Sequence, residues 1–318
     1  MPENDFNAVI DVSGEGLVSM MDGPELHPKL VELCMMHNRI TTIEGLQQLT
    51  ALTKLNLRAN RINVISGLQC CTALQELELY ENSISSLDGL SGLKCLTMLD
   101  VSFNQVTSMA ALASAGLEAL TKLYLANNRI SRIEGLSGLS SLQLLELGSN
   151  SIRTVEHLAD VPSLTELHIG RNKIQSLQAA FVGLGQLSVL GIASNRLSSL
   201  DGTQDLLALQ ELYADHNNIQ SLSPLEPLTQ LQTLDLGSNQ VQSLECCRGF
   251  KRLEELWLND NPIDSLDVLK SLADLPRLQT LRLSGCPLSR EANYRQDVCQ
   301  ALSQLEQLDA DPVPTARS

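Results

Sequence analysis

The chain has 318 residues, of which 43% are hydrophobic but only 3% aromatic, and its formal net charge is −15. This hydrophobic content excludes a wholly disordered chain, and a core of aliphatic residues favours a repetitive architecture over a globule filled by large rings. The negative charge disfavours nucleic acid and anionic membrane as partners and favours a basic or metal-loaded protein surface. A role in solubility alone explains the charge equally well.

No stretch of the sequence approaches the roughly 18 consecutive apolar residues that a membrane span needs. Residues 1–11 are polar and acidic, so we expect no secretory signal. The eight cysteines are scattered and do not cluster at the two ends, as disulfide-bonded caps would. These features predict reduced thiols and a protein of the nucleus and cytoplasm that is not secreted.

The dominant feature is a unit of the form L-x-x-L-x-L-x-x-N-x-I that recurs every 22 to 24 residues. Its asparagines are Asn38, Asn60, Asn82, Asn104, Asn128, Asn150, Asn172, Asn195, Asn217, Asn239 and Asn261. A twelfth unit has Cys286 in place of the asparagine. Several positions match in each unit, so the repeat is a strong signal.

The spacing within one unit predicts its conformation. Leu145 and Leu147 flank a polar residue, which is the alternation of a strand with one buried face. Asn150 follows, and its amide can satisfy backbone groups where the chain leaves the strand. Further apolar residues then point inward, namely Ile152, Val155, Leu158 and Leu164. One such coil cannot bury its apolar face alone, but stacked coils share a continuous core.

The predicted fold is therefore an α/β solenoid with a curved parallel sheet on its concave face and short 3₁₀ or helical turns on its convex face. We expect an N-terminal cover over residues 1–28, about twelve repeats over 29–286, a C-terminal cap over 287–311 and a disordered tail over 312–318. Two units are longer, at residues 110–116 and 179–185, and we expect their extra residues to bulge on the convex side.

The sequence contains no phosphate-binding loop, no His-Glu-x-x-His motif and no Cys-x-x-Cys pair. We therefore expect neither an enzyme nor a cofactor or metal site. The Cys-Cys pairs at 70–71 and 246–247 fall in the returning segments, where we expect one thiol of each pair to pack in the core. An enzyme that uses these pairs as redox centres is the alternative.

The residue between the two strand leucines is expected to face the concavity in every unit. In chain order these residues are Cys34, Asn56, Glu78, Asp100, Tyr124, Glu146, His168, Gly191, Tyr213, Asp235, Trp257 and Arg282. Carboxylates and three of the few aromatic side chains share this row, and tyrosine and tryptophan often dominate protein interfaces. The row thus favours a partner with Arg or Lys around an apolar patch, although strands favour aromatic residues in any case.

The unit resembles the short repeat class of the leucine-rich-repeat regulatory subunits of protein phosphatase 1, typified by regulatory subunit 7. The resemblance spans about residues 30–311 and rests on segments 99–104, 128–136, 145–150 and 256–261, together with Tyr294-Arg295 ahead of Leu308-Asp309. It implies a regulatory or chaperone-like subunit that grips the phosphatase catalytic subunit on its concave face.

The contact residues that the resemblance implies are Asp100, Tyr124, Glu146, His168, Asp235, Glu255, Trp257 and Arg282. Tyr124 stands where the family has Phe, and His168 and Arg282 replace aromatic residues of the family. The resemblance implies a protein that is monomeric on its own, with the phosphatase catalytic subunit and a second regulatory protein as partners. A ciliary or cytoskeletal adaptor built from the same repeat is the alternative.

Overall fold

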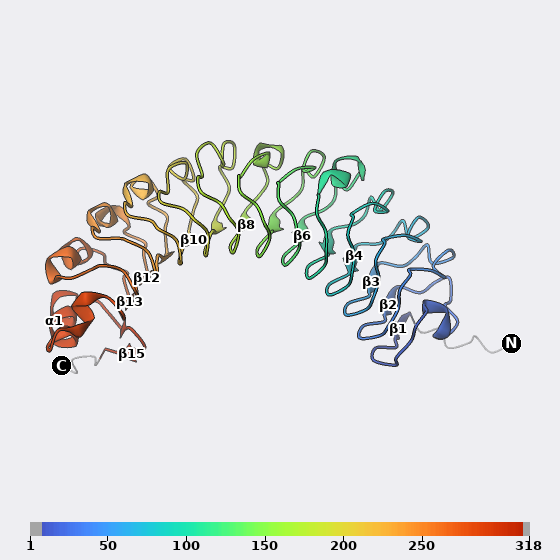
Figure 1. Cartoon of the computed structure of the whole chain (residues 1–318), viewed down its shortest axis with the longest axis horizontal. Coiled ribbons are helices and arrows are strands. Elements are labelled where there is room, and N and C mark those ends of the chain that lie inside the picture. The colour runs from blue at the N-terminus through green and yellow to red at the C-terminus, as the bar shows by residue number, and fades with distance from the viewer. Residues whose placement is uncertain (1–7, 314–318) are drawn as a thin grey trace. The chain divides into compact units, whose positions relative to one another are not determined.

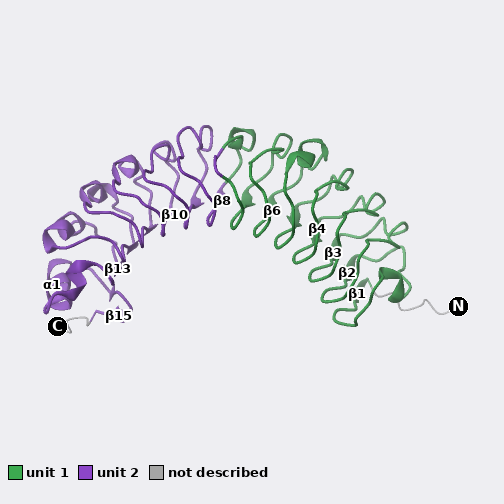
Figure 2. Cartoon of the chain, in the orientation of Figure 1, with its two compact units in different colours: residues 1–152, 156–164 green, residues 153–155, 165–318 purple. Residues whose placement is uncertain are grey.

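The computed structural model describes residues 8–313, so residues 1–7 of the predicted cover and 314–318 of the predicted tail lie outside the described residues. The chain is a parallel β-solenoid of about twelve turns, as the repeat predicted. It divides into two compact units, unit 1 with residues 1–152 and 156–164 and unit 2 with residues 153–155 and 165–318 (Figure 2). Within each unit the strands lie along the inner side of the curve and the returning segments along the outer side (Figure 1).

From residue 8 onward, unit 1 has seven short strands that pair in parallel in chain order. They are β1 (Val9–Asp11), β2 (Glu32–Cys34), β3 (Lys54–Asn56), β4 (Glu76–Glu78), β5 (Met98–Asp100), β6 (Lys122–Tyr124) and β7 (Leu144–Glu146). Three 3₁₀ helices lie between strands, η1 (Met20–Asp22), η2 (Ala110–Ser114) and η3 (Leu158–Asp160). The predicted cover thus includes a strand, since β1 pairs with β2 in the same register as later strands.

Unit 2 repeats this arrangement and ends in a cap. Its strands are β8 (Glu166–His168), β9 (Val189–Gly191), β10 (Glu211–Tyr213), β11 (Thr233–Asp235), β12 (Glu255–Trp257), β13 (Thr280–Arg282), β14 (Gln307–Leu308) and β15 (Asp311–Pro312). Its helices are η4 (Ser223–Leu225), η5 (Glu245–Gly249), η6 (Leu266–Leu272), η7 (Pro287–Arg290) and α1 (Tyr294–Ala301). Only β14 and β15 pair antiparallel among the described strands of this unit.

The core consists of columns of aliphatic side chains, one from each turn. The turn that begins at β6 buries seven of them, Leu123, Leu125, Ile130, Ile133, Leu136, Leu139 and Leu142, each fully. Because each turn offers the same positions, neighbouring turns bury one another's apolar faces. One thiol of each cysteine pair joins this core, Cys71 and Cys247, which confirms the sequence prediction, and none of the eight cysteines forms a disulfide.

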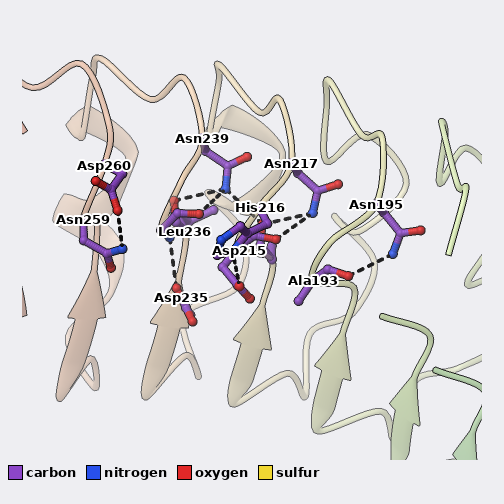
Figure 3. A network of polar contacts seen from close by, with 12 residues as sticks. Ala193, Asn195, Asp215, His216, Asn217, Asp235, Leu236, Asn239, Asn259 and Asp260 are labelled. Carbon is purple, nitrogen blue, oxygen red and sulfur yellow. Dashed lines mark hydrogen bonds and ion pairs between the residues drawn. The ribbon is translucent and has the colours of Figure 1, made fainter. Parts of the chain in front are cut away.

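The repeat asparagine connects each turn to its predecessor. In unit 2 the Asn239 amide donates to the carbonyls of Leu236 at 3.0 Å and Gly237 at 3.2 Å, within its own turn (Figure 3). It also donates to Ala214 O of the preceding turn at 3.0 Å, and its oxygen accepts from the Ile219 amide at 2.9 Å. The side chain is 1% exposed, so these contacts replace water for buried backbone groups. The predicted role of the asparagine is thereby confirmed.

The last unit keeps part of this pattern without an asparagine. The Cys286 thiol donates to Leu258 O at 3.1 Å, the contact that an asparagine amide would make to the preceding turn. The cap supplies an acceptor, because Asp309 Oδ1 accepts from the amides of Leu283 and Ser284 at 2.7 Å. The Tyr294 hydroxyl in α1 donates to Asp309 Oδ2 at 2.8 Å and fixes this carboxylate. The cap thus closes the last turn with polar contacts.

Neighbouring turns approach each other closely at Gly89. A side chain at Gly89 would overlap the carbonyl oxygen of Ile65 in the preceding turn, whereas a side chain at Gly92 would meet nothing within 4 Å. Both glycines have a positive φ, 95° and 93°. An alanine therefore suffers about the same backbone strain at either position, and only the contact with the preceding turn differs. We expect Gly89→Ala to lower the free energy of unfolding by about 2 kcal/mol more than Gly92→Ala, in equilibrium denaturation of the full chain. Equal losses would contradict the close approach.

Candidate protein-binding face

From β2 to β13 each three-residue strand buries its middle residue, and its first and third side chains lie on the opposite side. We call these outward side chains the strand face of each unit. In unit 1 it includes Asp100, Tyr124 and Glu146, which lie side by side on β5, β6 and β7 in one register. All three are partly buried. The structure therefore brings together the three predicted contact residues of unit 1.

In unit 2 the strand face brings four predicted contact residues together. Asp235, Trp257 and Arg282 are register partners on β11, β12 and β13, and Glu255 is the first residue of the Trp257 strand. His168 lies at the other end of the unit, on β8. Its partner position on β9 is Gly191, where a side chain would come within 2.8 Å of the imidazole. The glycine thus leaves room for the His168 ring.

The strand face of unit 1 carries more carboxylates than amines. Its charged members are Asp11, Glu32, Glu76, Glu78, Asp100 and Glu146 against Lys54 and Lys122. Lys54 forms an ion pair with Glu76 at 3.2 Å. The first four strands line a shallow hollow of about 290 Å³, with Glu32 and Glu78 among its walls. This part of the face suits a positively charged partner.

Glu78 is a carboxylate with a raised pKa on the strand face of unit 1. It is half-buried and accepts a hydrogen bond from Asn56 Nδ2 at 2.7 Å. Burial raises the pKa of Glu78, and the neighbouring charges of Asp100 and Glu76 raise it further. Arg58 and the hydrogen bond from Asn56 offset part of this rise, and the charged form remains less favoured than in a free carboxyl. A partner that supplies a basic side chain here would relieve the repulsion.

Trp257 and Arg282 form a pair on the strand face of unit 2. The Arg282 guanidinium carbon lies 4.5 Å from the centroid of the Trp257 ring, a cation–π arrangement. The Trp257 indole nitrogen is buried and has no hydrogen-bond partner among the described residues. Asp235 lies beside the ring, and burial is the main cause that raises the pKa of its carboxyl. An aromatic ring, an unpaired donor and a disfavoured carboxylate therefore meet at one place.

Tyr213 adds a second polar ring to this unit. Its hydroxyl donates to Glu211 Oε2 at 2.7 Å across β10. Burial and this carboxylate raise the pKa of Tyr213 to about 12, so the phenol stays neutral and keeps its proton for hydrogen bonding. This hydrogen bond restrains the ring, which presents an uncharged contact. Such preorganised rings lose little entropy on binding.

The sequence reasoning missed one group of side chains altogether. Arg58, Tyr80 and Phe103 lie just beyond the strands, in the turns that follow β3, β4 and β5. These residues are not strand residues but occupy the two positions ahead of each repeat asparagine. A comparison of those positions along the units would have shown one Tyr and one Phe in consecutive turns.

The described part of the chain contains neither a cluster of metal-binding side chains nor a helix that could cross a bilayer. Over residues 8–313 no three His, Cys, Asp or Glu side chains are placed to hold a metal ion. The single α-helix of this range, α1, has eight residues, fewer than a membrane span requires.

Two family profiles match the sequence. "Leucine rich repeat" matches residues 96–152, 118–174 and 162–219, and "Leucine Rich repeats (2 copies)" matches 28–70, 72–114, 207–248, 229–271 and 251–293. The second profile alone covers more than half of the chain. A search of curated proteins found no significant match.

Several solved structures share the fold. An internalin (InlF) from Listeria monocytogenes superposes with a TM-score of 0.67 at 24% identity, covering 89% of this chain and 87% of its own. A leucine-rich-repeat protein from Leptospira interrogans gives 0.61 at 22% identity and covers 94% of both chains. Internalin C2 from Listeria monocytogenes is 30% identical with a TM-score of 0.54, over 64% of this chain and 83% of its own.

The raised pKa of Glu78 predicts that replacing it with the neutral glutamine stabilises the fold, by an amount that depends on pH. A carboxyl whose folded pKa is raised stabilises the fold below its unfolded pKa, near 4.5, and loses that contribution as the pH rises through the folded value. We therefore expect Glu78→Gln to raise Tm at pH 7 and to have a shrinking effect towards pH 4, measured by calorimetry. Glu118→Gln, at an exposed position of the same unit, is the matched control. A gain that grows as the pH falls would contradict the assignment.

Proposed function

Because the chain belongs to the leucine-rich repeat family of protein-interaction scaffolds, we propose that it is a non-enzymatic subunit that binds the catalytic subunit of protein phosphatase 1. In this proposal it acts in the nucleus and cytoplasm as a regulatory or chaperone-like protein. The strand face of each unit is a binding surface in this proposal, and a second regulatory protein joins the complex. The resemblance of the repeat units to phosphatase regulatory subunits supplies the identity of the partner.

The observation that carries the proposal is the gathering of Asp235, Glu255, Trp257 and Arg282 on neighbouring strands of unit 2. Tryptophan and arginine dominate binding energies when they sit in a cluster that a partner can desolvate. Here the ring is partly covered, and its indole nitrogen lacks an acceptor. In the complex a partner carbonyl or carboxylate accepts a hydrogen bond from this nitrogen, while Glu255 receives a basic side chain.

The strand face of unit 1 supports the same kind of partner. Asp100, Tyr124 and Glu146 present a ring between two carboxylates in one register. Carboxylates around an aromatic residue suit an arginine-rich protein surface with an apolar centre. Electrostatic attraction of this kind mainly accelerates association and weakens with salt. The proposal therefore implies a complex that forms more slowly as the salt concentration rises.

Truncation of the aromatic anchor tests the proposal. We expect Trp257→Ala to weaken binding of the purified phosphatase catalytic subunit about thirtyfold, because a central interface tryptophan contributes about 2 kcal/mol or more. Glu255→Ala should weaken it less and mainly slow association. Leu207→Ala is the matched control, since Leu207 is 59% exposed on a returning segment of the same unit. Surface plasmon resonance with the full chain measures all three.

Two results would decide against the proposal. If the wild-type chain does not bind the catalytic subunit, the phosphatase is not its partner. If Trp257→Ala and Glu255→Ala bind as well as wild type, the strand face of unit 2 is not the contact. Purification of native complexes that contain tubulin or dynein components and no phosphatase would instead support the adaptor alternative.

A further inference from the structure

Three side chains in consecutive turns of unit 1 form a continuous stack, which we call the edge cluster: Arg58, Tyr80 and Phe103. The Arg58 guanidinium carbon lies 4.3 Å from the centroid of the Tyr80 ring. The Tyr80 and Phe103 ring centroids are 4.7 Å apart, with an angle of 45° between the planes. The cluster lies in the turns after β3, β4 and β5, beside the strand face.

Phe103 is unfavourable for the fold in two respects. Its φ is 57°, the left-handed region, which a bulky side chain rarely adopts and which disfavours Phe by about 1 kcal/mol or more. Its side chain is also one of the few large apolar groups left outside the core, at 46% exposure. The equivalent positions in the other repeat turns of unit 1 hold smaller or polar residues, His37, Ala59, Glu81, Asn127 and Ser149. Phe103 is thus better explained by an interaction than by packing.

Two acidic residues lie close to Phe103 in the chain and in the adjoining turn. Glu81 is exposed and lies in the adjoining turn, where its backbone amide donates to Ser102 O at 3.0 Å. Asp100 is three residues before Phe103 and lies beside Glu78 on the strand face. On the far side of the ring the next turn offers only the small residues Ala126 and Asn127, so no large side chain continues the stack. One arginine of the chain, Arg58, already covers the opposite end.

We propose that the edge cluster binds an arginine side chain from a basic segment of a partner protein. The guanidinium stacks on the open face of Phe103, as Arg58 stacks on Tyr80, and the carboxylates of Glu81 and Asp100 balance its charge. Arginine suits this site better than lysine because its planar, weakly hydrated head stacks on rings. The inference rests on the proposed function only for the identity of the partner. It extends the binding surface from the strand face onto the turns of unit 1.

Fluorine NMR of the full chain tests this docking site. The chain has four phenylalanines, so labelling with 4-fluorophenylalanine gives four signals, and Phe103→Asn identifies the one from residue 103. Hexaarginine peptide is the probe, and hexalysine controls for charge. We expect hexaarginine to shift the Phe103 signal and to bind about threefold more tightly than hexalysine. An unmoved Phe103 signal, or equal binding of the two peptides, would overturn the inference.

Two variants separate binding from folding. Phe103→Asn should keep or raise Tm, because Asn tolerates the left-handed region, yet weaken hexaarginine binding about fivefold. Arg58→Gln should strengthen that binding about twofold, since it removes a competing positive charge. Val64→Ala, at a position that is 58% exposed on a returning segment of the same unit, should change neither quantity. Unchanged affinity in Phe103→Asn, or weaker binding in Arg58→Gln, would refute the inference.

Binding of the phosphatase catalytic subunit, measured beside hexaarginine binding, separates this inference from the proposed function. If Phe103→Asn weakens hexaarginine binding but the wild-type chain does not bind the phosphatase, the docking site is supported and the proposed partner is wrong. If Trp257→Ala loses the phosphatase and Phe103→Asn retains it at full affinity, the proposed function stands and the edge cluster does not serve this partner.

Discussion

The fold depends on one interaction more than any other, the hydrogen bonding of each repeat asparagine to two turns of the solenoid at once. Strands of three residues leave many backbone carbonyls without a partner where the chain turns. A single amide serves several of them, and its oxygen receives an amide from the turn before, as Asn239 shows. The leucine columns form the buried core, and the asparagines provide hydrogen bonds for the backbone groups that are buried with it.

This constraint determines where the protein has freedom. The leucine, isoleucine and asparagine positions are committed to the stack, whereas the first and third residues of each strand and the two positions before each asparagine are not. Several unusual features of the surface fall on these uncommitted positions. Trp257 with Arg282, the acidic row around Glu78 and the exposed Phe103 ring each depart from what the fold alone would favour. Binding is thus the simplest physical reason for them.

The surface features also share a chemical theme. Carboxylates are pressed together or half-buried, as at Glu78 and Asp235, so that their charge lacks full solvation. Rings lie beside them, and two are already covered by arginines of the chain, Tyr80 by Arg58 and Trp257 by Arg282. These internal pairs display the geometry that a basic partner would use. A partner arginine would meet a surface already arranged for guanidinium groups.

The sequence by itself determined the repeat, the buried columns, the role of the asparagines and the row of outward residues, because these follow from a local period that each turn repeats. It also placed one thiol of each cysteine pair in the core. Only the tertiary structure decided that Arg282 lies over Trp257, that Phe103 stacks on Tyr80 and that Asp309 accepts from the amides of Leu283 and Ser284. These contacts join residues of different turns or of the cap, and the orientation of a ring or guanidinium depends on how those turns pack, which no period along the chain encodes.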